Sequence, residues 1–178
     1  MQRENGMATV KQVLKAKTGK SVHTIGAQAS LFEAIGMMSH TGVGALVVTA
    51  SGDQNGAVHG IVTERDYARK VILQDKASRT TTVGEIMTSP VTSIGLETRT
   101  DDCMALMTHH RIRHLPVIEN GRLIGMLSIG DMVRHLIDEQ QFAIDQLESY
   151  VRGPHHEAPT CALTRRSPLP QTLATRLA

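Results

Sequence analysis

The chain has 178 residues, of which 40% are hydrophobic, so it can form one compact domain or two small ones that share a core. It contains two Phe, two Tyr and no Trp and has a net charge of +2, which argues against base stacking on single strands and against the positive field of a DNA-binding protein. No stretch approaches the ~18 apolar residues of a membrane span, and the N-terminus lacks a signal-peptide pattern. We therefore expect a soluble, cytoplasmic protein with no nucleic-acid or membrane partner.

From residue 22 onward the sequence contains an internal repeat. Residues 22–48 align with residues 91–117 at a shift of 69 positions. From Gly60 onward the shift is 65 positions, which places Asp66 on Asp131. The difference of four residues falls in a turn, where an insertion costs little and leaves the repeat unit intact.

The first unit is expected to begin with a short strand at 22–25. A helix follows, because apolar residues recur at helical spacing: Leu31, Ala34, Ile35 and Met38. The apolar run "GALVV" at 44–48 predicts a strand covered on both faces. A turn rich in Gly and Asn leads to a second strand, "GIV" at 60–62, and a helix over 64–73 closes the unit.

The second unit repeats this order after the linker "VGEIMTSP" at 83–90, where Pro90 breaks any helix. We expect a strand at 91–94, a helix, the strands "HLPVI" and "GML", and a closing helix over 129–150. In the first of these helices the residues that match the apolar positions of the first repeat are Thr100, Cys103, Met104 and Met107.

This order predicts an α/β (α+β) fold of two β-α-β-β-α repeats related by a pseudo-two-fold axis, with both sheets packed into one core because each unit alone is small. The closing helix extends beyond the repeat with further apolar residues, and the tail that follows it has a disordered composition. We divide the chain into an N-terminal segment and helix (1–21), two repeat domains (22–82 and 83–138), a C-terminal helix extension (139–152) and a disordered tail (153–178).

Each repeat carries the motif Gly, two apolar residues, Ser or Thr, two variable residues and Asp: "GIVTERD" at 60–66 and "GMLSIGD" at 125–131. One interpretation is a helix cap, in which Thr63 pairs with Asp66 and Ser128 with Asp131, worth about 1 kcal/mol each. Another is a ligand site, because a carboxylate at a helix N-terminus can accept hydrogen bonds from the two hydroxyls of a ribose. In that case the glycines would let a planar base lie close to the backbone. The two interpretations are compatible.

The repeated motif, the linker "VGEIMTSP" and the segment "RIRHLPVIENGRLIGMLSIGD" resemble a tandem pair of cystathionine-β-synthase (CBS) domains, also called a Bateman module, over roughly residues 10–140. The resemblance implies two nucleotide clefts between the repeats, in which Asp131 and Asp66 hold ribose hydroxyls and Ser128 and Thr63 support the sugar or phosphate. It also implies flat homodimers. The extended helix would pack across the dimer or on the face of this disc, and a role in the core of the chain alone is the alternative.

For the phosphate, the resemblance implies the basic residues Arg113 and His114 in the second repeat. The first repeat departs from the pattern, with Gly44 and Ala45 in their places, so its cleft needs other charges. Arg65, Arg69 and Lys70 are the candidates, although the last two can equally form a solvated helix face. The resemblance further implies that the base lies against segments of the opposite unit, with ordinary strand packing as the alternative: Thr24, Ile25, Val43 and Gly44 for one cleft, and Ser93, Ile94 and Ile112 for the other.

We thus expect a stand-alone regulatory protein of signal transduction, not an enzyme, that requires no cofactor and senses energy or redox state through an adenine nucleotide. AMP is the leading ligand, with ATP, ADP and NAD(H) as alternatives, and the expected partners are a second copy of the chain and an unidentified regulated protein. One alternative is a homodimeric interaction module without a nucleotide role. A metal-dependent enzyme is less favoured, because the nine histidines show neither an HExxH nor an HxH pattern and Cys103 and Cys161 form no CxxC.

Overall fold

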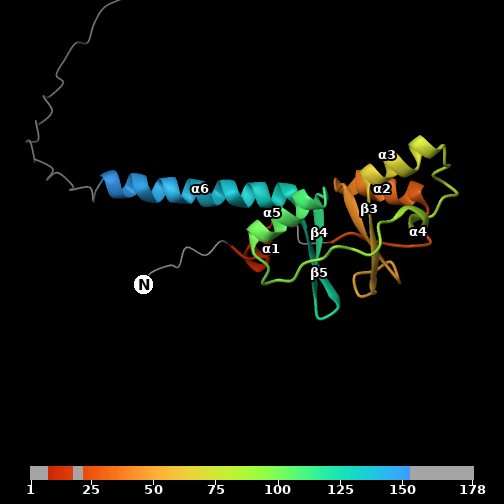
Figure 1. Cartoon of the computed structure of the whole chain (residues 1–178), viewed down its shortest axis with the longest axis horizontal. Coiled ribbons are helices and arrows are strands. Elements are labelled where there is room, and N and C mark those ends of the chain that lie inside the picture. Colours follow the sequence, from red (N-terminus) through yellow and green to blue (C-terminus); the bar gives the residue numbers. More distant parts are fainter. Residues whose placement is uncertain (1–7, 18–21, 153–178) are drawn as a thin grey trace, which may run out of the picture. The chain divides into compact units, whose positions relative to one another are not determined.

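The computed structural model describes residues 8–17 and 22–152 (Figure 1). The expected tail at 153–178, with Cys161, lies outside the described residues. Contacts divide the chain into a unit that ends at Gln140 and a second unit that begins at Gln141, within the last helix. Both repeats belong to the first unit.

The first repeat forms the three-stranded sheet β1-β2-β3 with two helices. Its elements are β1 (Thr24–Gly26), α2 (Leu31–Thr41), β2 (Ala45–Thr49), β3 (Val58–Thr63), α3 (Glu64–Lys70) and a short 3-10 helix, η1 (Ile72–Gln74). Strand β2 pairs in parallel with β1 and antiparallel with β3, and all five of its residues are buried, as expected for a strand covered on both faces. The predicted order of elements is confirmed here.

The second repeat forms a two-stranded antiparallel sheet, β4-β5. Its elements are α5 (Thr100–His109), β4 (His114–Glu119), β5 (Arg122–Ser128) and α6 (Ile129–Arg152). The turn between the strands contains Asn120 and Gly121, both with positive φ, which suits a tight hairpin.

The prediction of a strand at 91–94 is wrong, because the structure has no strand over these residues. In its place the described chain has a single parallel bridge between Ile94 and Val117, at the position where Ile25 pairs with Val48 in the first repeat. At this bridge Ile94 makes both hydrogen bonds of a parallel pair: its N–H donates to the Pro116 carbonyl, and its carbonyl accepts from Ile118 N–H. The second repeat therefore keeps the register in which Ile25 pairs with Val48, but the pairing is reduced to a single residue, Ile94.

The expectation of one shared core is also wrong. The buried apolar residues form one cluster in each repeat, and a small third cluster of Val22, Val47 and Leu123 brings residues of β2 and β5 together. Each repeat thus has its own interior, and the two meet through a few residues.

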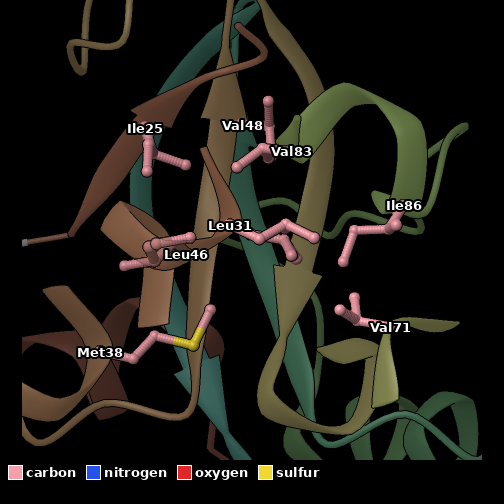
Figure 2. Packing of buried hydrophobic residues seen from close by; sticks show 10 residues of the cluster. Ile25, Leu31, Met38, Leu46, Val48, Val71, Val83 and Ile86 are labelled. Carbon is pink, nitrogen blue, oxygen red and sulfur yellow. The ribbon is translucent and has the colours of Figure 1, made fainter. Parts of the chain in front are cut away.

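Two short helices supplement these interiors: α1 (Val10–Ala16) and α4 (Val83–Ile86). Val83 and Ile86 of α4 pack with Leu31 in the core of the first repeat, as Figure 2 shows. Val10 and Val13 of α1 are buried in the core of the second repeat. Each helix therefore completes the core of the repeat that does not follow it in the sequence, and in Figure 1 α1 lies beside β5 and α4 beside β3.

Helix α6 begins directly after β5 and runs for 24 residues. Its described part carries a series of exposed apolar side chains: Val133, Leu136, Ile137, Phe142, Ile144, Leu147, Tyr150 and Val151. None of the described helices is long and apolar enough to cross a membrane.

Candidate functional site

Both copies of the motif form complete helix caps. In the second repeat the backbone N–H and the hydroxyl of Ser128 donate to Asp131 Oδ2 at 2.7 Å each, and Asp131 N–H donates back to Ser128 Oγ at 3.2 Å. In the first repeat Thr63 N–H and Oγ1 lie 3.1 and 2.7 Å from Asp66 Oδ2, and Asp66 N–H donates to Thr63 Oγ1 at 3.1 Å. The capping interpretation is confirmed at both positions.

The motif glycines pack closely against other segments of the fold. A Cβ on Gly60 would lie 2.6 Å from Met87 Sδ and 3.1 Å from the Thr88 carbonyl oxygen, and a Cβ on Gly125 would lie 3.0 Å from a methyl group of Leu14. The segment after α4 and the helix α1 therefore already occupy the space beside these glycines. The role of these glycines beside a planar base stays a prediction.

Asp131 has a third hydrogen-bond donor, Lys17, which the sequence did not suggest. Lys17 Nζ donates to Asp131 Oδ2 at 2.9 Å and to the Met126 carbonyl at 3.0 Å. Burial acts to raise the pKa of Asp131, but the hydrogen bonds from Lys17 and Ser128 outweigh it, and the pKa lies below its ordinary value. The carboxylate is therefore ionised at neutral pH.

Asp66 is neutralised from its own helix. Lys70 Nζ lies 3.1 Å from Asp66 Oδ1, one turn along α3, and donates to the Ile86 carbonyl at 2.7 Å. Both oxygens of Asp66 are thus engaged, Oδ2 by Thr63 and Oδ1 by Lys70. At Asp131 every hydrogen bond from the described residues ends on Oδ2, which leaves Oδ1 able to accept others.

Arg113 and His114 lie where the sequence placed them, at the start of β4. The Arg113 carbonyl accepts from Ile129 N–H at 2.9 Å, so this segment is fixed to the first residue of α6, while the Arg113 side chain is exposed. Burial lowers the pKa of His114; Asp131 acts to raise this pKa, and Lys17 and Arg113 act to lower it. His114 is therefore chiefly neutral at pH 7 and offers hydrogen bonds, not a second positive charge.

The corresponding place in the first repeat is less positive. Gly44 stands where the second repeat has Arg113, and a Cβ there would lie 3.2 Å from Glu64 Oε2 and 3.8 Å from His114 Cε1. The two repeats therefore approach each other at Gly44 and His114, and the first repeat contributes an acid at this point.

Of the other cations expected in the first repeat, Arg65 donates to the Arg111 carbonyl at 3.2 Å across the two repeats. Arg111 has a φ of 53° at the position where the first repeat has Gly42, whose φ is 68°. Arg69 is exposed at the end of α3. Arg65 and Lys70 are thus tied to protein oxygens.

The residues expected to contact a base are largely occupied by the fold. Ile25 and Ile94 are buried in the cores of their repeats, and Ile112 packs against the second core. Thr24 Oγ1 donates to the Gly52 carbonyl at 2.9 Å, and Ser93 is exposed. Their role at a ligand stays a prediction.

The structure thus brings Asp131, Ser128, Arg113 and His114 together with Lys17. Asp66 and Thr63 form a second, separate group around Lys70. Among the described residues no group of three or more His, Cys, Asp or Glu side chains is placed to hold a metal ion.

Comparison with known proteins gives a consistent result. The model of the CBS domain family matches residues 6–72 and 83–138. A mitochondrial CBS domain-containing protein of Arabidopsis thaliana, CBSX3, is 41% identical over 151 residues, which are 82% of this chain and 72% of the relative.

Solved structures agree with this match. A candidate signal-transduction protein with CBS domains from Burkholderia ambifaria superposes with a TM-score of 0.70 at 49% identity, over 75% of this chain and 96% of the other. A hexameric CBS-CP12 protein from bloom-forming cyanobacteria superposes with a TM-score of 0.62 at 26% identity, over 73% of this chain and 72% of the other.

Proposed function

The chain belongs to the CBS domain family and carries the domain twice, and from this premise we propose that it is a regulatory protein that binds an adenine nucleotide at Asp131. AMP is the leading ligand, and ATP, ADP and NAD(H) are the alternatives. Its similarity to a candidate signal-transduction protein with CBS domains supports a regulatory role. Sensing of energy or redox state is the function that such a ligand would serve.

The observation that carries the proposal is the state of the Asp131 carboxylate. It is ionised, 19% exposed as a side chain, and held in place by Ser128 and Lys17 through Oδ2 alone. A fixed carboxylate with one oxygen left to accept hydrogen bonds suits a vicinal diol such as that of ribose. Capping and ligand binding therefore use different atoms of the same residue.

The charges around Asp131 favour a phosphorylated ligand. Lys17 contacts this carboxylate, and Arg113 is a second cation that acts on the adjacent His114. The neutral ring of His114 can add a hydrogen bond to phosphate. The first repeat has Glu64 beside Gly44, and its cation Lys70 covers Asp66 Oδ1. We therefore expect the Asp131 site to bind the nucleotide more tightly than the Asp66 site.

Signalling would follow from differential affinity. A nucleotide that contacts both repeats near Gly44 and His114 favours one relative packing of the repeats over another and shifts the population towards it. The regulated partner would then recognise the favoured state. The cytoplasmic location stays a prediction, and the Arabidopsis relative is named as mitochondrial.

The test is a thermal-shift series of the full chain with AMP, ADP, ATP and NADH. A ligand present at 100 times its dissociation constant adds about 2.7 kcal/mol to the free energy of unfolding. For a chain of this size that corresponds to a rise of roughly 5–10 °C in the melting temperature. The absence of a rise with every adenine nucleotide would reject the proposal.

That negative result would favour the second candidate, a homodimeric interaction module, for which α6 supplies a specific observation. Its exposed residues Val133, Ile137, Ile144, Leu147 and Val151 alternate at spacings of three, four and seven, which is the heptad pattern of a two-stranded coiled coil. Branched residues at Ile137, Ile144 and Val151 with Leu147 between them fit a second copy of the same helix. The two functions are compatible, since a dimer can also bind nucleotide.

A further inference from the structure

Lys17 caps the C-terminal end of α1, and both hydrogen bonds of its side chain reach the second repeat. Its ammonium group bridges Asp131 Oδ2 and the Met126 carbonyl. About a quarter of its side chain is exposed, at 26%, so the cation is partly withdrawn from water. Partly buried charges interact more strongly than surface charges and are screened less by salt.

The position of this lysine is fixed by packing. Val10 and Val13 of α1 are buried in the second core, and Leu14 lies against Gly125 of β5. The Lys17 N–H donates to the Val13 carbonyl at 3.0 Å, which fixes the backbone of Lys17 to the end of α1. The ammonium is therefore held beside Asp131 before any ligand arrives, and little side-chain entropy remains to be lost on binding.

The first repeat offers a close comparison. Lys70 also bridges the motif acid and a backbone carbonyl, but it comes from the same helix as Asp66 and covers Oδ1. Lys17 comes from a different element and shares Oδ2 with the cap, so it adds a positive charge without covering Oδ1. Both lysines therefore pair with the motif acid, but Lys70 occupies the oxygen that a ligand would use, whereas Lys17 leaves that oxygen accessible.

We propose that Lys17 determines the specificity of the Asp131 site for phosphorylated nucleosides over unphosphorylated ones, an inference that rests on the proposed function. A ribose held by Asp131 carries its 5′-phosphate within reach of a four-carbon lysine stem that already ends at that carboxylate. The ammonium then exchanges the Met126 carbonyl for a phosphate oxygen and keeps its contact with Asp131. A nucleoside without phosphate gives Lys17 nothing to bind, so its affinity does not depend on this residue.

The experiment is isothermal titration calorimetry of the full chain with AMP and with adenosine. Lys17→Met, which keeps the length of the side chain and removes its charge, is compared with Lys17→Arg and with the matched control Lys70→Met. We expect Lys17→Met to weaken AMP binding roughly ten- to a hundredfold, the cost of one charge-assisted hydrogen bond, and to leave adenosine binding within about twofold. Lys17→Arg should retain most of the preference for AMP, and Lys70→Met should leave it unchanged.

Four results would overturn the inference. Equal losses for AMP and adenosine in Lys17→Met would mean that Lys17 only supports the fold. The same loss of preference for AMP in Lys70→Met would mean that the preference depends on the overall positive charge of the chain and not on the position of Lys17. If the wild-type chain binds neither ligand, the proposed function fails with the inference; if it binds both and only the preference is insensitive to Lys17, the proposed function stands. Melting temperatures of the three variants confirm that each is folded when titrated.

Discussion

Replacing Gly60 with Ala tests the role that the structure gives to the motif glycine. The added Cβ would lie 2.6 Å from Met87 Sδ, 3.0 Å from Met87 Cγ and 3.1 Å from the Thr88 carbonyl oxygen. Met87 can rotate away, but Thr88 cannot move freely. Its backbone exchanges two hydrogen bonds with Ile61, at 2.8 and 3.1 Å. The strand and the segment after α4 must therefore separate to admit one methyl group.

Insertion of a methyl group into a packed interior typically costs 1–3 kcal/mol, and we expect Gly60→Ala to lower the free energy of unfolding by about that amount. The melting temperature should fall by roughly 2–12 °C. Gly36→Ala is the matched control, because Gly36 lies in the middle of α2, is exposed, and has no atom within 4 Å of the added Cβ. That change should stabilise the chain by about 0.5–1 kcal/mol through helix propensity.

The assay is urea unfolding followed by circular dichroism for both variants and for Gly60→Ala combined with Met87→Ala. Because Met87 Sδ is the nearest atom, the double variant should lose less stability than the two single variants together, and the Thr88 oxygen should keep the rescue incomplete. A Gly60→Ala protein as stable as the wild type would refute the reasoning. So would strict additivity of the two changes, because the clash with Met87 would then contribute nothing.

Two further predictions concern His114 and α6. Because the pKa of His114 is lowered in the folded chain, the unfolded state binds more protons below pH ~6.5, and this residue makes stability fall as the pH drops through that value. His114→Gln should therefore show a smaller loss of stability between pH 7.5 and pH 5.5 than the wild type, measured by unfolding at both pH values, and equal losses would contradict the assignment. If the chain forms the proposed dimer through α6, Leu147→Glu lowers the mass measured by light scattering from that of a dimer to that of a monomer without lowering the melting temperature. A wild-type chain with the mass of a monomer, or a dimer whose mass Leu147→Glu leaves unchanged, would exclude α6 as the dimer contact.

The internal repeat accounts for most of what the sequence predicted. Once residues 22–48 are aligned with 91–117, each helix or strand that is clear in one copy supports the weaker one in the other. The structure follows this alignment closely. The strand irregularity after Val48 in β2 recurs after Val117 in β4, and Val43 N–H and Ile112 N–H make the same bond to the carbonyls of Met38 and Met107, respectively.

The predictions were wrong where tertiary contacts, and not the local sequence pattern, determine the structure. The pattern at 91–94 is the same as at 22–25, yet only Ile94 pairs with the neighbouring strand. Likewise, the apolar residues of α1 and α4 are visible in the sequence, but their spacing does not say which repeat they enter. In the structure Val10 of α1 enters the core of the second repeat and Val83 of α4 enters the core of the first.

At the site, the sequence identified the acids and their caps because the motif is local. Lys17 was missed because it is 114 positions from Asp131 and lies outside the repeat alignment. A comparison of "TVKQVL" at 9–14 with "TVGEIM" at 82–87 would have identified α1 and α4 as equivalent helices, since both begin with a threonine cap. It would not have found the lysine, because no lysine follows α4 at the matching position.

The most direct test of the account is calorimetric titration of AMP into the full chain and into its Asp131→Asn and Asp66→Asn variants. Asparagine has the shape of aspartate and can still cap the helix, but it cannot accept hydrogen bonds at both side-chain atoms. We predict that Asp131→Asn weakens binding by about 1–3 kcal/mol, a loss of roughly 5- to 150-fold, and that Asp66→Asn changes it by less than about twofold. An unchanged affinity in Asp131→Asn, or a larger loss in Asp66→Asn, would contradict the assignment of the nucleotide to Asp131.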